Sequence, residues 1–263
     1  MSKIIYLSKM EQFVLKFISG LDIITIEDLH ELFPELSNIQ INKICSQLAS
    51  KGYLYRLKKG IYIINEEPSS VPIIKDPYRI CQILFGGYIG FSSALRIYDL
   101  LPYEPFTIFT ITKNKSREYT IGEYIFKAIA MGDKAIGMTH YRGIYVSTLE
   151  KTFFDCLYKP QYCGGYSTIT QALYESKINW DNFITYLDFA SPSLCQRSGY
   201  VLEILKIETD LNIPERILQY LKSRIKNKTK LIPTGKSVGK YVKDWLLLDN
   251  LGKENILSWW YYG

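Results

Sequence analysis

Three helix-start signals lie within the first 40 residues of this chain of 263 residues. In each signal a hydroxyl side chain is followed three positions later by an acidic or amide side chain, which is the spacing of a capping box. The signals are Ser8 with Glu11, Thr25 with Asp28, and Ser37 with Gln40. Apolar residues at helical spacing follow each signal, and Gly20, Pro34 and Gly52 stand where the helices would end. The pattern therefore predicts three short helices before residue 53.

A hairpin is expected directly after the third helix. The runs 53–57 and 61–64 are rich in aromatic and branched residues, and they flank the glycine-containing turn at 58–60. Three short helices followed by a basic hairpin are the order of elements in a winged helix-turn-helix, in which one helix enters the major groove. The sequence therefore predicts a winged helix-turn-helix over residues 1–67.

The third predicted helix and the hairpin are free of acids, because no Asp or Glu occurs between Leu36 and Asn65. Amide, hydroxyl and lysine side chains on a helix can read base edges, and cations on a hairpin can contact phosphates. The predicted DNA-binding residues are Ser37, Asn38, Gln40, Asn42, Lys43, Ser46 and Gln47 on the helix, and Arg56, Lys58 and Lys59 on the hairpin. An alternative interpretation is a three-helix module that docks a protein and leaves its basic face to solvent.

Polar, proline-bearing residues at 65–72 mark the best domain boundary, and a second domain is expected over 72–263. Strand-like segments are expected at 106–112, 123–130 and 139–146, with a polar loop at 113–120. Helical patterns occur at 76–85, from 91 to before Pro102, and at 148–158, 167–176, 180–190, 198–209 and 214–225. The predicted fold class is therefore α+β: a winged helix-turn-helix, then a mixed domain with a small antiparallel sheet and a helical C-terminal half.

The formal net charge of +6 comes from the end of the chain. Residues 214–263 carry ten basic and four acidic side chains, whereas the rest of the chain is balanced. A basic segment of this kind can bind polyanions or an acidic protein surface. The cations expected on this partner surface are Lys222, Arg224, Lys226, Lys228 and Lys230. The aromatic run at 259–262 can stack on bases, dock a protein or pack inward.

Several short segments carry a resemblance to a known family. They are Arg-Leu-Lys-Lys-Gly-Ile-Tyr at 56–62, Gly-Phe-Ser-Ser-Ala-Leu at 90–95, the run 143–155 with the pairs at 159–160 and 164–165, and the segments 198–205 and 243–245. Over nearly its whole length the chain resembles the AbiEi family of antitoxins and transcriptional autorepressors from abortive-infection type IV toxin–antitoxin systems. The resemblance implies that the winged helix binds inverted repeats at its own promoter. It also implies that the second domain neutralises a nucleotidyltransferase-like toxin.

Glu150, Lys151 and Asp155 form the charged part of the most specific of these segments. Lys151 and Asp155 share one helix face at a spacing of four, and Glu150 lies one position aside. One interpretation is a capping box, since Ser147 and Glu150 have its spacing. The other is that the three charges shape an antitoxin surface, because fixed charges can set the choice of partner.

The sequence offers little for catalysis. Two histidines, His30 and His140, supply no triad or zinc site, and the five cysteines contain no CxxC pair, so reduced core thiols are expected. Gly235-Lys236-Ser237 matches the end of a phosphate loop, but Lys230 stands at the position of the leading glycine. We therefore expect no enzyme activity, no cofactor and no metal.

Neither a membrane span nor a secretory signal is expected. The longest uncharged stretch, 80–95, is short and broken by glycines, and the N-terminal segment lacks the pattern of a signal peptide. A cytoplasmic location follows as the expectation.

The predicted function is a non-catalytic DNA-binding autorepressor and antitoxin. Its expected partners are double-stranded promoter DNA with inverted repeats and a nucleotidyltransferase-like toxin encoded nearby. One winged helix per chain implies a monomer or weak dimer that binds two half-sites cooperatively. Two other classes of function stay open: an enzyme that processes nucleic acid, and a winged-helix regulator that responds to a small ligand.

Overall fold

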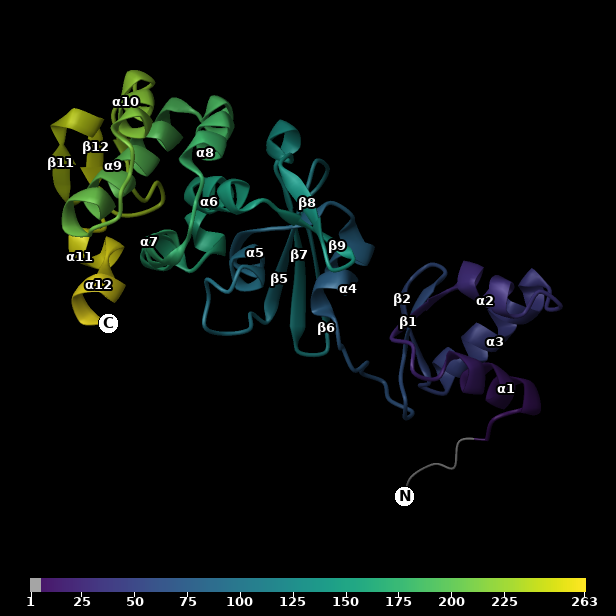
Figure 1. Ribbon diagram of the computed structural model, residues 1–263. Coiled ribbons are helices and arrows are strands. Elements are labelled where there is room, and N and C mark those ends of the chain that lie inside the picture. The colour runs from purple at the N-terminus through teal and green to yellow at the C-terminus, as the bar shows by residue number, and fades with distance from the viewer. Residues whose placement is uncertain (1–5) are drawn as a thin grey trace.

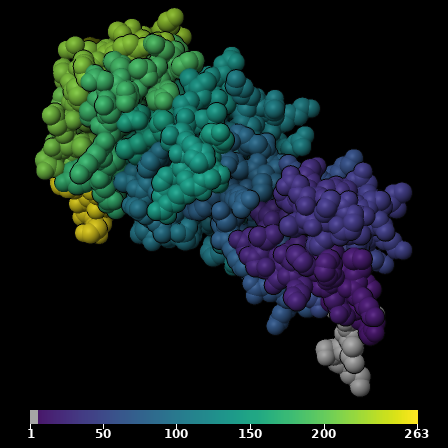
Figure 2. Space-filling model, turned by 45° about the vertical axis from the view of Figure 1, so that its right-hand side comes forward, coloured from purple at the N-terminus to yellow at the C-terminus, as the bar shows by residue number. Residues whose placement is uncertain are grey.

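The computed structural model describes residues 6–263. The first five residues, which belong to the predicted domain 1–67 and to the segment searched for a secretory signal, lie outside the described residues. The chain forms a small N-terminal lobe and a larger main body, which are joined by an irregular segment (Figure 1). The space-filling view shows the N-terminal lobe projecting from one end of the main body (Figure 2).

The N-terminal lobe contains the three predicted helices and the predicted hairpin. Its elements are α1 (Lys9–Ile18), β1 (Ile23–Thr25), α2 (Ile26–Leu32), α3 (Asn38–Ser50), β2 (Leu54–Lys58) and β3 (Ile61–Ile64). All three capping boxes form, with Ser8, Thr25 and Ser37 as the N-caps. The short strand β1 was not predicted from the sequence, and it pairs antiparallel with β3 in a sheet of order β1-β3-β2.

A core of its own holds this lobe together. Val14 and Ile18 from α1, Leu29 from α2, and Ile41 and Leu48 from α3 are buried in it. These residues belong to the apolar stripes that follow the capping boxes. Phe13, Phe17 and Leu32 of the same stripes are instead exposed, so α1 and α2 turn only part of their predicted apolar faces inward. Lys51, just after α3, forms an ion pair with the buried Glu11 of α1, with 2.6 Å between Lys51 Nζ and Glu11 Oε1.

The hairpin also packs against the main body. Ile63, which is buried, and the half-buried Tyr55 and Leu57 join a hydrophobic cluster that contains Ile80 and Cys81 of α4 (Pro77–Phe85). The connecting segment is tied to the N-terminal lobe as well, because the Ser69 amide donates to the Gly52 carbonyl at 3.0 Å. The two lobes therefore share an apolar contact, which the hairpin makes on the side of the N-terminal lobe. Figure 1 shows the hairpin on the side of this lobe that faces the main body.

After α4, the main body forms a six-stranded sheet of order β6-β7-β5-β4-β9-β8. The strands are β4 (Tyr88–Ile89), β5 (Thr107–Thr112), β6 (Arg117–Ile121), β7 (Tyr124–Ala130), β8 (Met138–Tyr141) and β9 (Ile144–Ser147), and α5 (Phe91–Ile97) lies between β4 and β5 in sequence. The predicted antiparallel sheet is wrong, because β5 with β7 and β4 with β9 are parallel pairs. The predicted loop 113–120 is also wrong in its second half, where β6 forms a hairpin with β7.

The single strand predicted at 139–146 is two strands in the structure. Arg142 and Gly143, both with positive φ, form the tight turn between β8 and β9. The apolar and aromatic residues on both sides of this turn give one continuous strand-like pattern, so the sequence pattern did not indicate the turn. The α+β class itself is confirmed, since the chain combines many helices with three small sheets.

The rest of the main body is mainly helical. Its helices of seven or more residues are α6 (Leu149–Tyr158), α7 (Gly165–Glu175), α8 (Trp180–Tyr186), α9 (Pro192–Glu208) and α10 (Glu215–Ser223). Helix α9 begins six residues before the predicted start at 198, because the Ser191 side chain caps it and Pro192 occupies its first turn. None of the helices in residues 6–263 has the combined length and apolar character needed to span a bilayer.

The predicted helical C-terminal half matches α6 to α10, but the basic segment after α10 is an irregular region with a small sheet that was not predicted. The sheet consists of β10 (Thr229–Lys230), β11 (Lys240–Val242) and β12 (Leu247–Asp249), in the order β10-β12-β11. Short helices α11 (Lys253–Ile256) and α12 (Ser258–Tyr262) end the chain beside α7 (Figure 1). Trp245, which is fully buried, joins this region to α9 through a hydrogen bond of 2.6 Å from its Nε1 to Glu203.

Candidate nucleic-acid interface

Helix α3 has one buried face and one exposed polar face. Ile41, Ile44, Cys45 and Leu48 point into the core of the N-terminal lobe, whereas the predicted DNA-binding side chains of this helix are all exposed. Lys43, Ser46 and Gln47 have no side-chain hydrogen bond or ion pair to any other part of residues 6–263. The structure therefore presents a lysine, a hydroxyl and an amide to solvent, with no acid on the same helix.

Some of the predicted DNA-binding side chains already form hydrogen bonds within α3 and its N-cap. Ser37 and Gln40 form the capping box, in which Gln40 Oε1 accepts from the Ser37 amide at 2.8 Å. The Asn42 side chain donates to the Asn38 carbonyl at 2.7 Å. Their carboxamide groups are therefore partly satisfied before any ligand arrives. The least committed polar groups are those of Lys43, Ser46 and Gln47, toward the middle of α3.

Ile39 is a residue of this face that the sequence reasoning did not single out. It is 81% exposed although it is a large apolar side chain on the first turn of α3. Its position could have indicated this, because Ile39 lies about 200° around the helix from Ile41, opposite the buried stripe. An apolar side chain among polar ones is the group that contacts a thymine methyl in the major groove.

The cations of the hairpin fall into two groups. Arg56 and Lys59 are exposed and have no ion pair among the described residues. Lys58 instead donates from its Nζ to the Ile83 carbonyl of α4 at 2.6 Å. In the structure this side chain therefore links the hairpin to the main body, and its predicted contact with phosphate stays a prediction.

Lys151 and Asp155 are the clearest correction in the main body. Both are fully buried within α6, where they form an ion pair with each other, so they do not belong to a surface. The N-cap of α6 is Thr148, one residue after the predicted Ser147, and its hydroxyl accepts from the Lys151 amide at 3.3 Å. Glu150 is half-buried and accepts from the Asn179 amide at 3.1 Å, so it joins α6 to the start of α8.

Burial dominates the electrostatics of this pair. It lowers the pKa of Lys151, and it raises the pKa of Asp155 to about 7, although each charge favours the other. Aromatic rings surround the ammonium, with the Phe154 ring centre at 5.2 Å and the Tyr88 ring centre at 5.9 Å. Asp155 Oδ2 has no hydrogen-bond partner within residues 6–263. The pair is therefore a buried polar element of the core.

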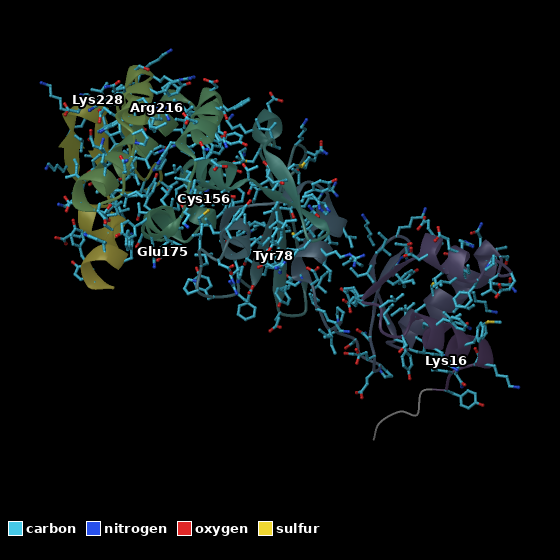
Figure 3. All side chains as sticks on the ribbon, viewed as in Figure 1. Lys16, Tyr78, Cys156, Glu175, Arg216 and Lys228 are labelled. Atoms are coloured by element: carbon cyan, nitrogen blue, oxygen red, sulfur yellow. The ribbon has the colours of Figure 1, made fainter. Side chains whose placement is uncertain are left out.

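Three of the five cations predicted in the basic C-terminal segment are engaged with other parts of the chain. Lys222 pairs with Glu203 at 3.2 Å, and Lys230 donates to the Gly235 carbonyl at 2.8 Å. Arg224 donates to the Tyr220 hydroxyl at 2.5 Å and pairs with Asp188. Of the five cations predicted there, Lys226 and Lys228 are exposed, and Lys228 lies over the Tyr241 ring. Figure 3 shows Lys228 at the end of the main body farthest from the N-terminal lobe.

The structure also shows where the phosphate-loop-like segment, the potential metal ligands and the cysteines lie. The segment around Gly235 is a turn held by the Asn250 side chain, which donates to the Ile232 and Lys236 carbonyls at 2.9 Å. Within the described part of the chain, no three His, Cys, Asp or Glu side chains are grouped as metal ligands. All five cysteines are buried thiols, and Cys163 and Cys156 contact each other, with 2.8 Å between their sulfurs.

Comparison with known proteins gives a fold relationship. No protein-family model matches the chain, and no curated protein matches it. The chain is similar to the crystal structure of the RV2827C protein from Mycobacterium tuberculosis, with a TM-score of 0.67 and 14% sequence identity over 93% of this chain and 92% of that chain. The likeness extends over both lobes. At this level of identity it shows a shared fold.

Proposed function

We propose that the N-terminal lobe is a winged helix-turn-helix that binds double-stranded DNA, with α3 in the major groove. The observation that carries this proposal is the exposed, acid-free face of α3, where Lys43, Ser46 and Gln47 have no partner within the described residues. Arg56 and Lys59 on the adjacent hairpin extend the positive surface. Such a surface can meet both base edges and phosphates, whereas a solvated face without a function has no need to exclude acids.

Within this proposal the protein acts as a transcriptional autorepressor and as the antitoxin of a type IV toxin–antitoxin system. Support for the antitoxin role comes from the AbiEi-like segments of the sequence, several of which lie in the main body. The N-terminal lobe would recognise inverted repeats in the promoter, and the main body would counter a nucleotidyltransferase-like toxin. No catalytic step is assigned to the protein.

A mobility-shift titration with the DNA upstream of the coding sequence tests the DNA-binding role. We expect a preference for this DNA over random duplex of the same length, and an affinity that falls as salt rises, because phosphate contacts release counterions. Equal affinity for both duplexes at moderate salt would remove the repressor proposal.

The antitoxin role is tested separately with a variant of the full chain. Lys43→Ala with Gln47→Ala changes the exposed face of α3 and leaves the main body intact. If the main body carries the antitoxin function, this variant loses promoter binding but still rescues growth when the neighbouring toxin gene is expressed from an independent promoter. Loss of rescue by this variant at equal protein level would place the antitoxin function on the DNA-binding face instead.

A ligand-responsive regulator is a second candidate, because the main body contains a cavity of about 690 Å³. Lys159 and Arg197 line it together with the start of α7 at Gly164 and Gly165. A cavity of this size lies in the range that holds small metabolites. Native mass spectrometry of the purified protein tests this candidate, since a retained small molecule that changes promoter affinity would favour it.

A further inference from the structure

Large apolar side chains are exposed together on the outer helices of the N-terminal lobe. They are Met10 (44% exposed), Phe13 (45%), Phe17 (54%), Leu21 (45%) and Leu32 (44%), and we call them the α1–α2 patch. Met10, Phe13 and Phe17 follow one another at spacings of three and four, so they share one face of α1. The Phe13 and Phe17 rings lie 4.9 Å apart and within 5.7 Å of the Phe33 ring from the end of α2, which makes the surface continuous.

The size of the α1–α2 patch indicates a modest interface. At about 200 Å² for each fully exposed side chain of this kind, the patch offers roughly 450 Å² of apolar surface. A stable interface buries about 800 Å² on each partner. A contact centred on this patch is therefore strong enough for transient association and too small for a permanent complex.

Charges of opposite sign lie beside the patch residues of the two helices, basic on α1 and acidic at the end of α2. Lys9 and Lys16 neighbour Phe13 on α1, at spacings of four and three, whereas Glu31 and Glu35 flank Leu32 at the end of α2. All four are exposed, and none has an ion-pair partner within residues 6–263. Figure 3 shows Lys16 at the free edge of the N-terminal lobe, away from the main body.

This arrangement complements itself. A two-fold axis that runs along the patch, parallel to α1, brings the basic edge of each copy opposite the acidic edge of the other. Such an isologous contact uses the same patch twice and buries its apolar centre against itself. A partner of uniform charge would leave one of the two edges facing like charge, so a second copy of this chain fits better than a purely acidic or basic protein.

We infer that the α1–α2 patch is a weak dimer interface between two copies of this chain. The self-association stands on the patch alone, and its use on DNA rests on the proposed function. Two copies placed on neighbouring half-sites have a high local concentration, which turns a weak contact into cooperative binding. Lys43, Ser46 and Gln47 lie on α3 and are not patch residues, so association through the patch does not use the side chains proposed to read DNA.

Charge exchange tests the interface without removing its apolar core. Sedimentation equilibrium of the wild-type chain at about 10–100 µM should show reversible dimers, as expected for an interface below the standard size. Lys9→Glu with Lys16→Glu should weaken self-association, and so should Glu31→Lys with Glu35→Lys. A mixture of the two variants should associate about tenfold more tightly than either alone, because every edge then meets its opposite. A mixture no tighter than its components overturns the inference.

Two further measurements separate this inference from DNA binding. Phe17→Glu should abolish self-association and cooperativity on paired half-sites, while affinity for a single half-site changes by less than twofold. Ile207→Glu is the matched control, because Ile207 is 71% exposed on α9 and lies outside the patch. If the wild-type chain stays monomeric and binds paired half-sites without cooperativity, the interface is refuted, whether or not single half-sites are bound. If it dimerises but binds no DNA, the interface stands and the repressor proposal fails.

Discussion

Helices α3 and α6 start with the same kind of N-cap, but their polar side chains lie in opposite environments. Each has a hydroxyl N-cap, Ser37 in α3 and Thr148 in α6, and each carries charged or polar side chains that the sequence marked as functional. On α3 these side chains face solvent, whereas Lys151 and Asp155 of α6 are completely buried. A motif with charge on a helix is therefore no guide to exposure, and the neighbouring residues decide where the charge lies.

The difference comes from what packs around each helix. Helix α3 has a single apolar stripe, with polar residues around the rest of the helix. Helix α6 has one as well: Leu149, Phe153, Phe154, Cys156 and Leu157 fall within about half of its circumference, and Lys151 and Asp155 lie on the opposite side. Helices α5, α7, α8 and α9 all contact α6. Tertiary packing therefore buries Lys151 and Asp155, and the pattern of apolar residues in α6 alone would have placed them at the surface.

Loss of the Lys151 ammonium is the change with the largest expected effect. Lys151→Ala leaves the Asp155 carboxyl buried without its ion-pair partner, so we expect the free energy of unfolding to fall by about 3–5 kcal/mol. Urea denaturation followed by circular dichroism measures this loss. The double variant Lys151→Met with Asp155→Leu should recover most of the stability, because it removes both charges and fills the space. A stable Lys151→Ala protein would show that the pair is solvated.

The next effect is the pH dependence of the Lys151→Ala variant. Lys151 lowers the pKa of Asp155, which burial already raises to about 7, so its removal raises that pKa further. The native variant then holds a proton that the unfolded chain releases above about pH 4, and its stability falls as pH rises toward 7, by at most about 1.4 kcal/mol per pH unit. Urea titrations between pH 4 and 7 should show this slope. Lys151→Ala with Asp155→Asn should show none, and an equal slope in both variants would assign it to other groups.

A substitution on the exposed face of α3 should weaken DNA binding and leave the free energy of unfolding nearly unchanged. Lys43→Ala should weaken binding to the promoter by about 1–3 kcal/mol, the usual value of one base-reading side chain. Its unfolding free energy should change by less than about 0.5 kcal/mol, because Lys43 has no partner among the described residues. Titration of specific and random duplexes measures the first effect, and urea denaturation measures the second. Equal losses on both duplexes would make Lys43 a phosphate contact.

The fold was predictable where local signals agree with one another. Each capping box in the first 40 residues formed, because hydroxyl, acid or amide, and apolar stripe all point to the same helix start. The parallel pairing of β5 with β7 was not predictable, because β6 lies between them in sequence and only the tertiary packing decides which edge it joins. The hydrogen bonds of Lys58 and Lys222 were not predictable either. Their partners, Ile83 and Glu203, lie 25 and 19 positions away in sequence, beyond the range of any local pattern.

The smallest expected effects separate the two basic segments of the molecule. Arg56→Ala with Lys59→Ala removes two exposed hairpin cations, and Lys226→Ala with Lys228→Ala removes the two exposed cations predicted in the C-terminal segment. We expect the first pair to weaken all duplexes alike and to reduce the salt dependence of binding by about two counterions, since each phosphate contact contributes close to one. The second pair should leave both quantities unchanged, because Lys228 lies at the far end of the main body (Figure 3).

Both variants lose the same net charge, so a general electrostatic attraction to DNA would reduce the salt dependence of binding equally in the two. Mobility shifts at four salt concentrations distinguish these outcomes, and only a larger change for the hairpin pair supports DNA docking at α3 and the hairpin.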